Sequence, residues 1–586
     1  RLRGLCFSES GDKGMIAGKP WRYFREAVKT MELTGAQIIA ECLLEQRVDT
    51  VFGYPGGAVL NIYDALYEYR DRIRHVLTAH EQGAAHAADG YARSTGKAGV
   101  VIATSGPGAT NLVTGIATAY MDSIPMVAIT GNVAVELLGR DSFQEVDITG
   151  ITMPVTKHNF AVKRVEDLAD IIRRAFQIAQ SGRPGPVLID VPKDITASRC
   201  QYERQSPLPL SPSPRPEESR LAKAAEMLRQ SKRPFLYAGG GVIASGAAPE
   251  LLRFAETLQA PVCTSLMGLG GFPEDHPLSL GMIGMHGSYA AGMALDHSDL
   301  IVVLGARFSD RVAGDREKFG KQAKILQLDV DLAEVDKNVL VDRYLIGDLK
   351  ETLTALNGLL EPQDHREWLA RMEAWKTEAP RRTADPGEAP DHTHIIRCLN
   401  SLMGPEDILV TDVGQHQMWA AQDYRFLRPR TFLTSGGLGT MGYGLGASVG
   451  AQSARPDRRV VLITGDGSFH MNLNELVTLA SYELPVMVVV MNNQVLGMVR
   501  QWQKLFYGRR FSQTDPRRKT DFAALAKAFG IEGRTIVEDG QVEKALKEAF
   551  DLKKPVVVDC RISPDDNVLP MIPPGGTVDQ MITQMD

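Results

Sequence analysis

Short, uninterrupted apolar runs recur along this chain, and a longer stretch with helical periodicity follows most of them. Runs of this kind are typical of strands in parallel sheets, which are buried on both faces. Their alternation with helices predicts an α/β protein whose sheets are covered by helices on both sides. The runs lie at residues 98–106, 125–132, 234–241, 300–307, 324–331, 407–414, 459–467 and 485–493.

Two segments interrupt this alternation, at residues 206–219 and 378–391, and both are rich in proline and polar residues. We interpret them as linkers, the first of them extended. Each block that they separate carries its own strands, so the sequence predicts three doubly wound parallel-sheet domains, as the length of 586 residues allows. The expected domains span residues 31–205, 218–365 and 390–560, and residues 561–586 form a C-terminal tail.

Residues 1–30 differ from the rest because they show no sustained periodicity. We expect a disordered N-terminal extension there, with the natural start of the protein near Met31. An amphipathic helix should follow, with Leu33 or Thr34 near its beginning.

The bulk composition excludes several classes of partner. A formal net charge of -6 and an isoelectric point near 6.1 argue against nucleic acid and anionic membranes, which bind basic surfaces. The six cysteines form no CxxC pair, so neither a zinc site nor a disulfide framework is indicated. We therefore expect reduced thiols in a cytosol-like, cytoplasmic compartment. No apolar run approaches the ~20 residues that span a bilayer.

The strongest chemical signal lies in the third block. Asp466 and Asn493 follow two successive expected strands, and a helical stretch separates them. Ligands of parallel sheets bind outside the carboxyl ends of the strands. Both side chains carry hard oxygen donors, which suit magnesium that also binds phosphates. A GDG tripeptide alone is most often a tight turn. The order GDG, helix, strand and NN favours a metal and diphosphate site.

A second signal lies in the first block, where Glu81 follows the expected strand at residues 74–78 and begins an alanine-rich helix. The helix dipole alone favours a carboxylate at that position. Such a carboxylate is equally suited to exchange a proton with a bound cofactor.

The spacing from GDG to NN resembles the thiamine-diphosphate fingerprint of the decarboxylase superfamily. The resemblance implies that Asp466, the side chain of Asn493 and the carbonyl of Val495 hold Mg2+, which clamps the cofactor's diphosphate. It also implies that Glu81 faces the aminopyrimidine ring, at a site shared by two subunits. Further cofactor contacts are implied for Gly414, Gln415, His416, Gly439, Met441, Gly467 and Ser468.

The segments at residues 284–287, 305–311 and 497–512 resemble one family more closely, the catalytic subunits of acetohydroxyacid synthase, also called acetolactate synthase. The resemblance covers about residues 31–575. It implies decarboxylation of pyruvate and ligation of the two-carbon unit to pyruvate or 2-ketobutyrate. The products, 2-acetolactate and 2-aceto-2-hydroxybutyrate, serve branched-chain amino acid biosynthesis.

The same resemblance assigns residues to the reacting centre and to the substrate. Gly57, Phe143, Gln144 and Lys157 are implied near the reacting carbon, although Lys157 is equally well explained as a surface cation. Trp502 is as easily a packing aromatic. The implied substrate contacts are Met285, Arg311, Met498, Val499 and Trp502.

The resemblance also implies FAD in the middle block. Three glycines follow the strand at residues 234–238, and such a turn offers backbone donors to a phosphate, but a plain tight turn explains it equally well. The reaction needs no redox step, so this flavin would be structural. The implied contacts are Gly239, Gly240, Gly241, Met285, His286, Gly305, Arg307, Arg311, Asp329 and Asp348.

The resemblance implies a homodimer or homotetramer with shared active sites and a small regulatory subunit. Two alternatives remain open. One is a pyruvate oxidase-like flavin oxidoreductase on the same fold, and the other is a non-catalytic scaffold homologue. Glu81, Asp466 and Asn493 are all present, which argues against the scaffold.

Overall fold

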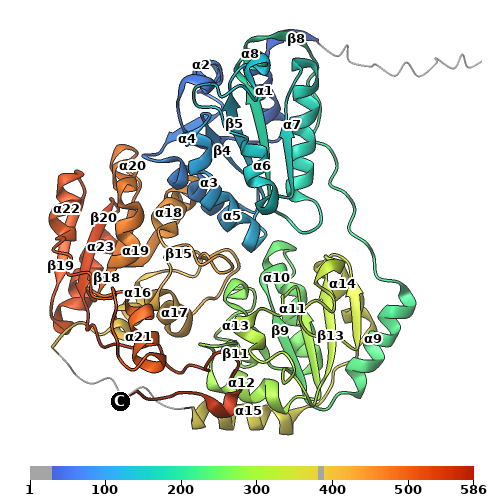
Figure 1. The fold of residues 1–586 in the computed structure, drawn as a ribbon. Helices are drawn as coiled ribbons and strands as arrows, with labels where there is room; N and C mark the ends of the chain where they lie inside the picture. The colour runs from blue at the N-terminus through green and yellow to red at the C-terminus, as the bar shows by residue number, and fades with distance from the viewer. Residues whose placement is uncertain (1–29, 380–387, 586) are drawn as a thin grey trace, which may run out of the picture.

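The computed structural model describes residues 30–379 and 388–585. The expectation for residues 1–29, and for the middle of the second linker, lies outside the described residues. Three six-stranded sheets form the scaffold, and every strand pair within them is parallel. The predicted α/β fold with three doubly wound sheets is therefore confirmed (Figure 1).

The N-terminal sheet has the strand order β3-β2-β4-β5-β7-β6. Its strands are β2 (Thr50–Tyr54), β3 (Arg74–Leu77), β4 (Gly99–Ala103), β5 (Met126–Asn132), β6 (His158–Ala161) and β7 (Pro186–Pro192). The helices around it are α1 (Gly35–Glu45), α2 (Leu60–Glu68), α3 (Glu81–Thr95), α4 (Pro107–Asn111), α5 (Val113–Asp122), α6 (Ile148–Thr152), α7 (Val165–Gln180) and α8 (Lys193–Ala197).

The helix expected after Met31 begins at Gly35. Thr34 caps it, and a capping box with Gln37 satisfies two backbone groups at its first turn. The four residues before it form strand β1 (Met31–Thr34), which pairs antiparallel with β8 (Arg199–Tyr202). That strand was not predicted.

The central sheet has the order β11-β10-β9-β12-β13-β14. Its strands are β9 (Pro234–Ala238), β10 (Val262–Thr264), β11 (Ser279–Met282), β12 (Leu300–Leu304), β13 (Lys324–Asp329) and β14 (Arg343–Ile346). Its helices are α9 (Glu218–Gln230), α10 (Gly240–Ala244), α11 (Ala248–Leu258), α12 (Tyr289–His297), α13 (Asp310–Ala313), α14 (Leu349–Leu359) and α15 (Arg366–Glu378). The segment before α9 contains no helix or strand and descends along the outside of the molecule (Figure 1).

The C-terminal sheet has the order β16-β15-β17-β18-β20-β19. Its strands are β15 (Ile408–Thr411), β16 (Phe432–Leu433), β17 (Val460–Gly465), β18 (Val486–Asn492), β19 (Glu532–Ile536) and β20 (Val556–Arg561). Its helices are α16 (His392–Leu402), α17 (Gln415–Asp423), α18 (Tyr443–Ala454), α19 (Asp466–Asn472), α20 (Leu476–Ser481), α21 (Gly497–Phe506), α22 (Phe522–Ala528) and α23 (Val542–Asp551).

Helices α3 and α18 join the first and third domains, as Figure 1 shows where the two lie side by side. Small residues line their contact: a Cβ on Gly446 would lie 2.8 Å from the carbonyl oxygen of Gly83. One buried apolar cluster runs through both domains. This close packing holds α3 against the third domain. Glu81 is the first residue of α3. None of the described helices is long and apolar enough to cross a membrane.

Candidate active site

Asp466 and Asn493 lie at the carboxyl ends of adjacent parallel strands. Gly465, the last residue of β17, pairs with Met491 near the end of β18, so the two side chains follow strands that end at the same edge. Asp466 is 4% exposed, and burial raises its pKa to about 6. The Asn493 amide donates to Gln415 Oε1 (3.2 Å), and Asn493 Oδ1 accepts the Val495 N–H (3.2 Å). Asn493, one of the predicted metal ligands, is therefore held next to Gln415.

The donor set at this edge suits a hard cation. It combines one carboxylate, one amide oxygen and one main-chain carbonyl, which are ligand types that magnesium accepts. The described residues contain no cluster of three His, Cys, Asp or Glu side chains of the kind that binds transition metals. The residues present fit magnesium in its expected role beside a diphosphate.

His416 lies beside these residues, and one of its ring nitrogens is buried without a hydrogen bond to any described residue. Its Nε2 has no hydrogen-bond partner, and burial lowers the pKa of the ring to about 3, so the imidazole is neutral. The ring packs on Gly465, where a Cβ would lie 2.8 Å from His416 Nδ1. A buried polar atom without a partner is expected where a polar ligand binds.

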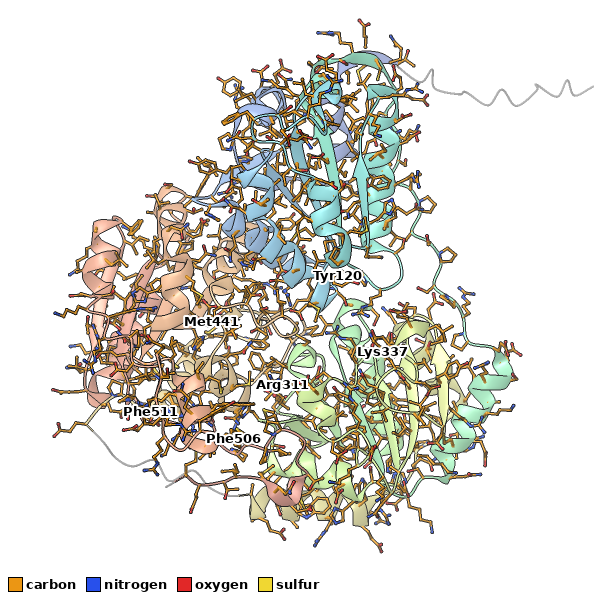
Figure 2. All side chains as sticks on the ribbon, in the orientation of Figure 1. Tyr120, Arg311, Lys337, Met441, Phe506 and Phe511 are labelled. Carbon is orange, nitrogen blue, oxygen red and sulfur yellow. The ribbon has the colours of Figure 1, made fainter. Side chains whose placement is uncertain are left out.

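The neighbouring loops leave space for a cofactor. Gly439 has a left-handed φ of 70°, and a Cβ there would meet no atom closer than 4.0 Å. Gly467 is close-packed instead, because a Cβ would lie 2.8 Å from a Leu496 methyl and 3.8 Å from Met441 Cε. The Ser468 hydroxyl donates to the Val413 carbonyl (2.8 Å). Met441 lies where the first and third domains approach each other (Figure 2).

Glu81 begins α3, which follows β3 after a short turn at residues 78–80, as the sequence predicts. The residue is 8% exposed, and Asn111 Nδ2 donates to Glu81 Oε2 (3.0 Å). A Cβ on Gly108 would lie 3.1 Å from Glu81 Oε1, so glycine leaves room for the carboxylate. The role of Asn111 as a partner of Glu81 was not predicted, because the position of the short helix α4 relative to α3 does not follow from the sequence.

Phe143 and Gln144 lie on an exposed loop of the first domain. Phe143 is 88% exposed, and Gln144 has a left-handed φ of 59°. Gln144 packs against Gly106, where a Cβ would lie 3.0 Å from its Cα. Gly57 begins a short 3-10 helix and faces open space. These residues lie on loops of the same domain as Glu81.

Lys157 lies elsewhere in the same domain. Its ammonium donates to the carbonyls of Ile178 and Ser181 at the end of α7, and burial lowers its pKa to about 8. Its backbone pairs with Pro186 at the amino ends of β6 and β7. Glu81 follows the carboxyl end of β3, so within one chain the structure does not bring Lys157 and Glu81 together.

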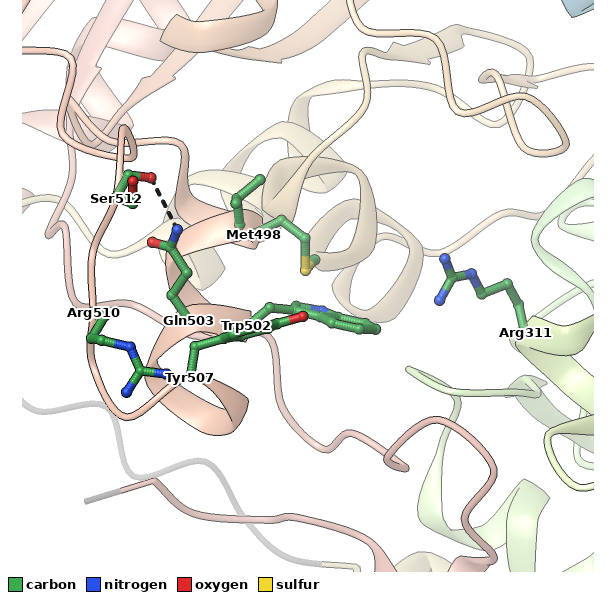
Figure 3. Close-up of a pocket in the computed structure, with 8 residues that line it drawn as sticks. Arg311, Met498, Trp502, Gln503, Tyr507, Arg510 and Ser512 are labelled. Carbon is green, nitrogen blue, oxygen red and sulfur yellow. Dashed lines mark hydrogen bonds between the residues drawn. The ribbon is translucent and has the colours of Figure 1, made fainter.

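A cavity of about 700 Å3 lies between α21 and the central domain. Arg311 extends from the central domain toward Trp502 and Met498 on α21 (Figure 3). Arg311 Nη1 also lies 3.6 Å from the sulfur of Met285. All five predicted substrate residues therefore line the cavity or contact its lining. The lining residues are Arg311, Met498, Val499, Trp502, Gln503, Tyr507, Arg510 and Ser512.

Four of these lining residues, at positions 503, 507, 510 and 512, were not predicted individually. They belong to the run at residues 497–512 that carries the resemblance. Gln503 lies on α21, and the other three follow the helix, where no periodicity indicates which side chains turn inward. Gln503 Nε2 donates to the Ser512 carbonyl (3.0 Å), which folds this loop back onto α21 (Figure 3).

The glycines after β9 mainly serve close packing. The Gly239 and Gly241 N–H groups donate to the carbonyls of Leu304 and Gly305. A Cβ on Gly241 would lie 2.7 Å from Gly305 Cα. Two of the three expected backbone donors are thus used within the protein, so a tight turn explains them. Gly240 is less crowded, because a Cβ there would meet no atom closer than 3.4 Å.

The other predicted flavin residues have mixed surroundings. Arg307 donates to the Met121 carbonyl (2.8 Å). Asp348 caps α14. Burial raises the pKa of Asp329 to about 6, and it lowers the pKa of His286 to about 4. The Nδ1 of His286 is buried without a partner, so His286 and Gly240 fit a ligand best.

Comparison with known proteins covers nearly the whole described chain. Residues 33–151, 221–356 and 412–560 match the N-terminal TPP binding domain, central domain and C-terminal TPP binding domain of thiamine pyrophosphate enzymes. The chain is 46% identical to a probable acetolactate synthase large subunit of Methanocaldococcus jannaschii, over 94% of this chain and 95% of the relative.

Two further relatives carry related names. One is the acetolactate synthase large subunit of Parasynechococcus marenigrum, with 46% identity over 94% of this chain and 91% of the relative. The other is the acetolactate synthase of Mycobacterium bovis, with 44% identity over 94% of this chain and 92% of the relative.

Proposed function

Because the chain belongs to the acetolactate synthase large-subunit family of thiamine pyrophosphate enzymes, we propose that it converts two 2-keto acids into one acetohydroxy acid and carbon dioxide. Two pyruvates give 2-acetolactate, and pyruvate with 2-ketobutyrate gives 2-aceto-2-hydroxybutyrate. The observation that carries this proposal is that Asp466 and Asn493 follow adjacent parallel strands of one sheet, while the buried Glu81 follows β3 of another sheet. The oxidase and scaffold alternatives are not favoured.

The metal and cofactor roles rest on the third domain. Asp466, Asn493 and the Val495 carbonyl would hold Mg2+, and Gln415 would fix Asn493 through its hydrogen bond. The unpartnered His416 nitrogen, with Gly414 and Gly439, would border the cofactor. When bound, thiamine diphosphate supplies the electron sink that decarboxylation of a 2-keto acid needs.

Glu81 would exchange a proton with the ring nitrogen of the cofactor's aminopyrimidine. Its low exposure keeps water from competing for that proton. Asn111 donates to one carboxylate oxygen, which leaves the other free to face the ring. Gly108 leaves the space that this contact needs.

The cavity beside α21 would receive the second keto acid. Arg311 supplies a guanidinium that can bind a carboxylate through two parallel hydrogen bonds. Met498, Val499 and Trp502 supply an apolar wall for its alkyl chain. Gly57, Phe143, Gln144 and Lys157 would complete the reacting centre. Lys157 would act there only from the position of a second subunit, since its own Glu81 lies at the other end of the sheet.

We also propose FAD as a structural ligand of the central domain, near Gly240 and His286. The carboligation transfers no net electrons, so the flavin has no redox step to perform. The backbone N–H groups of Gly239 and Gly241 already donate within the protein, so they are not available to the flavin at that turn.

A homodimer or homotetramer with shared sites is supported by exposed apolar side chains on both cofactor-binding domains. Phe143 is 88% exposed, Met153 68% and Met471 56%. A second copy of the chain would cover them. The relatives are named large subunits, which supports a separate small regulatory subunit as a further partner. The described cysteines are unpaired, which suits the bacterial cytoplasm that we propose as its location.

One assay tests the reaction directly. The chain is supplied with pyruvate, thiamine diphosphate and Mg2+, and acetolactate, carbon dioxide and oxygen consumption are measured together. One acetolactate per carbon dioxide, without matching oxygen consumption, is the expected result. Oxygen use that equals pyruvate use would favour the oxidase, and no turnover with bound cofactor would favour the scaffold.

A further inference from the structure

Glu475 of the third domain reaches across to the turn that precedes Glu81. It ends the short 3-10 helix that follows α19 and is fully buried. Its two carboxylate oxygens accept the N–H groups of Ala79 and His80, each at 3.1 Å. Thr478 donates to the same carboxylate (2.6 Å). These bonds occupy the last two backbone donors before the first turn of α3.

The fit around Glu475 leaves little freedom. A Cβ on Gly83 would overlap the Glu475 carboxylate, so glycine is needed where α3 passes it. Tyr482 of the third domain adds a contact one residue outside this turn, because its hydroxyl accepts the Leu77 N–H (2.8 Å). The third domain therefore holds the end of β3 and the last two residues of the turn before Glu81.

Asp122 connects the same two domains in the opposite direction, from the first domain to the third. It ends α5 in the first domain, and its side chain is fully buried. Its carboxylate accepts the N–H groups of Gly436 (3.1 Å) and Gly437 (2.7 Å) in the third domain. Arg93 donates to Asp122 as well (2.9 Å), which compensates the buried charge.

The loop that Asp122 holds leads to Gly439, where the cofactor's ring is expected. Thr118 lies one turn before Asp122 on α5, and its hydroxyl lies 2.7 Å from that of Thr440. Two side chains on one face of α5 thus hold both ends of the segment from Gly436 to Thr440.

We propose that Glu475 and Asp122 are reciprocal positioning residues. Each is a buried carboxylate of one domain that fixes a segment of the other domain next to the expected cofactor. Glu475 sets the position of the Glu81 carboxylate, and Asp122 sets the position of the loop around Gly439. Neither loop can then adopt its working geometry unless the two domains of the same chain are docked. The inference rests on the proposed role of Glu81 and extends it to two residues that contact neither cofactor nor substrate.

The two positions predict different kinetic defects. In Glu475→Gln one acceptor oxygen becomes an amide that faces a backbone N–H, so the turn before Glu81 shifts. A misplacement of about 1 Å costs about a hundredfold in rate. We expect that loss in kcat and in the exchange rate of the thiazolium C2 proton with deuterium. The half-saturating cofactor concentration should stay within about threefold, because the binding groups of the third domain are untouched.

In Asp122→Asn the loop around Gly439 loses an acceptor in the same way. We expect the half-saturating concentration of thiamine diphosphate to rise about tenfold or more, which corresponds to about 1.4 kcal/mol. The C2 exchange rate at saturation should change by less than about threefold, because the Glu81 turn is untouched. Glu538→Gln, an exposed change in the third domain, is the matched control.

Amide hydrogen exchange of the cofactor-free protein gives an independent measurement. Glu475→Gln should speed exchange in the peptide around Ala79 and His80, and Asp122→Asn should speed exchange around Gly436 and Gly437. If Glu475→Gln fails to fold, Thr478→Val is used in its place, and if Asp122→Asn fails to fold, Thr118→Val is used. The expected changes are the same in kind but smaller. Each of these substitutions removes only one hydroxyl contact at the same carboxylate or loop.

Glu81→Gln is measured in parallel. Normal C2 exchange in that variant would refute the role of Glu81, and the positioning proposal would then be judged on amide exchange alone. The proposal is overturned if Glu475→Gln keeps both the parent C2 exchange rate and the parent amide exchange. It is also overturned if both carboxylate variants change only the melting temperature.

Discussion

Gly450 on α18 lies directly against the main-chain carbonyl of Ala87 on α3, so that any side chain at 450 would overlap that oxygen. This contact lies in the interface that fixes α3, and with it Glu81, against the third domain. Backbone atoms on both sides leave no flexible group to move aside.

Gly450→Ala should therefore destabilise the protein, because overpacking of a close contact costs about 1–3 kcal/mol. Gly358→Ala is the control: Gly358 is exposed near the end of α14, with no atom within 4 Å of an added Cβ. That change should raise the melting temperature slightly, since glycine inside a helix costs about 0.5–1 kcal/mol relative to alanine. Equal melting temperatures for the two variants would show that α3 and α18 can separate at no cost.

Glu81→Gln should keep the fold and the binding of Mg2+ while acetolactate formation falls by several orders of magnitude. The amide cannot exchange a proton with the aminopyrimidine, although it still accepts the hydrogen bond from Asn111. Steady-state rates at saturating cofactor are the measurement. Retention of more than about a tenth of the activity, or about 1.4 kcal/mol of barrier, would exclude Glu81 as the activating group.

Most of the scaffold could be predicted because long buried strands leave an unambiguous pattern. The runs that became β5, β17 and β18 are almost wholly apolar, and helices follow them. Strands β1 and β16 were missed for a physical reason. They have four and two residues, and β1 exists only because Met31 pairs with Tyr202 far along the chain.

The positions of the candidate site residues could be predicted where those residues follow a strand. Asp466, Asn493 and Glu81 all follow recognisable strands, and parallel strands end at a common edge. Asp122 and Glu475 could not be found in this way. Each is an acid within or beside a helix, a pattern that fits a solvated surface equally well, and only the docking of the two domains buries them.

Asp466→Ala should weaken the binding of Mg2+ and of thiamine diphosphate together, because the proposed metal would join the protein to the diphosphate. Calorimetric titration of each ligand, in the presence and absence of the other, measures this coupling. Asp457→Ala, an exposed change before β17, is the control. Parent-like cofactor affinity at low Mg2+ would refute the assignment of Asp466 as a metal ligand.

His86 should make the stability of the protein depend on pH. Burial lowers the pKa of its ring to about 3 in the folded chain, below the value of about 6.5 for an unfolded one. As the pH falls, the His86 ring therefore takes up a proton in the unfolded chain before it does so in the folded chain. Above pH 6.5 the neutral ring does not lower the free energy of unfolding. Below pH 6.5 that free energy decreases by about 1.4 kcal/mol for each pH unit.

His86→Gln removes this titration, so its melting temperature should fall less steeply than that of the parent between pH 6.5 and 5. The glutamine keeps a polar group beside Gln82, which lies 3.5 Å from His86 Nε2. His297→Gln serves as the control, because that ring is about half exposed. Parallel curves for the parent and His86→Gln would mean that the buried ring takes up its proton without unfolding.

Trp502→Leu should change the choice of the second substrate. The indole lines the cavity with Met498 and Val499, opposite Arg311 (Figure 3). Its apolar surface can contact the extra methylene of 2-ketobutyrate, and one methylene in such a pocket is worth about 1–3 kcal/mol. The variant should still ligate two pyruvates, since Arg311, the proposed ligand of the carboxylate, remains. Its preference for 2-ketobutyrate should fall by about tenfold or more.

Competition between the two keto acids in one reaction, scored as the ratio of the two acetohydroxy acids, measures this preference. Phe511→Leu makes a comparable aromatic-to-aliphatic change nearby without altering the cavity lining, because Phe511 packs instead on Arg500. A lowered ratio in Trp502→Leu alone would assign substrate choice to the indole. An unchanged ratio would mean that Trp502 only packs against Phe506, with ring centroids 5.4 Å apart, and that discrimination arises elsewhere in the cavity.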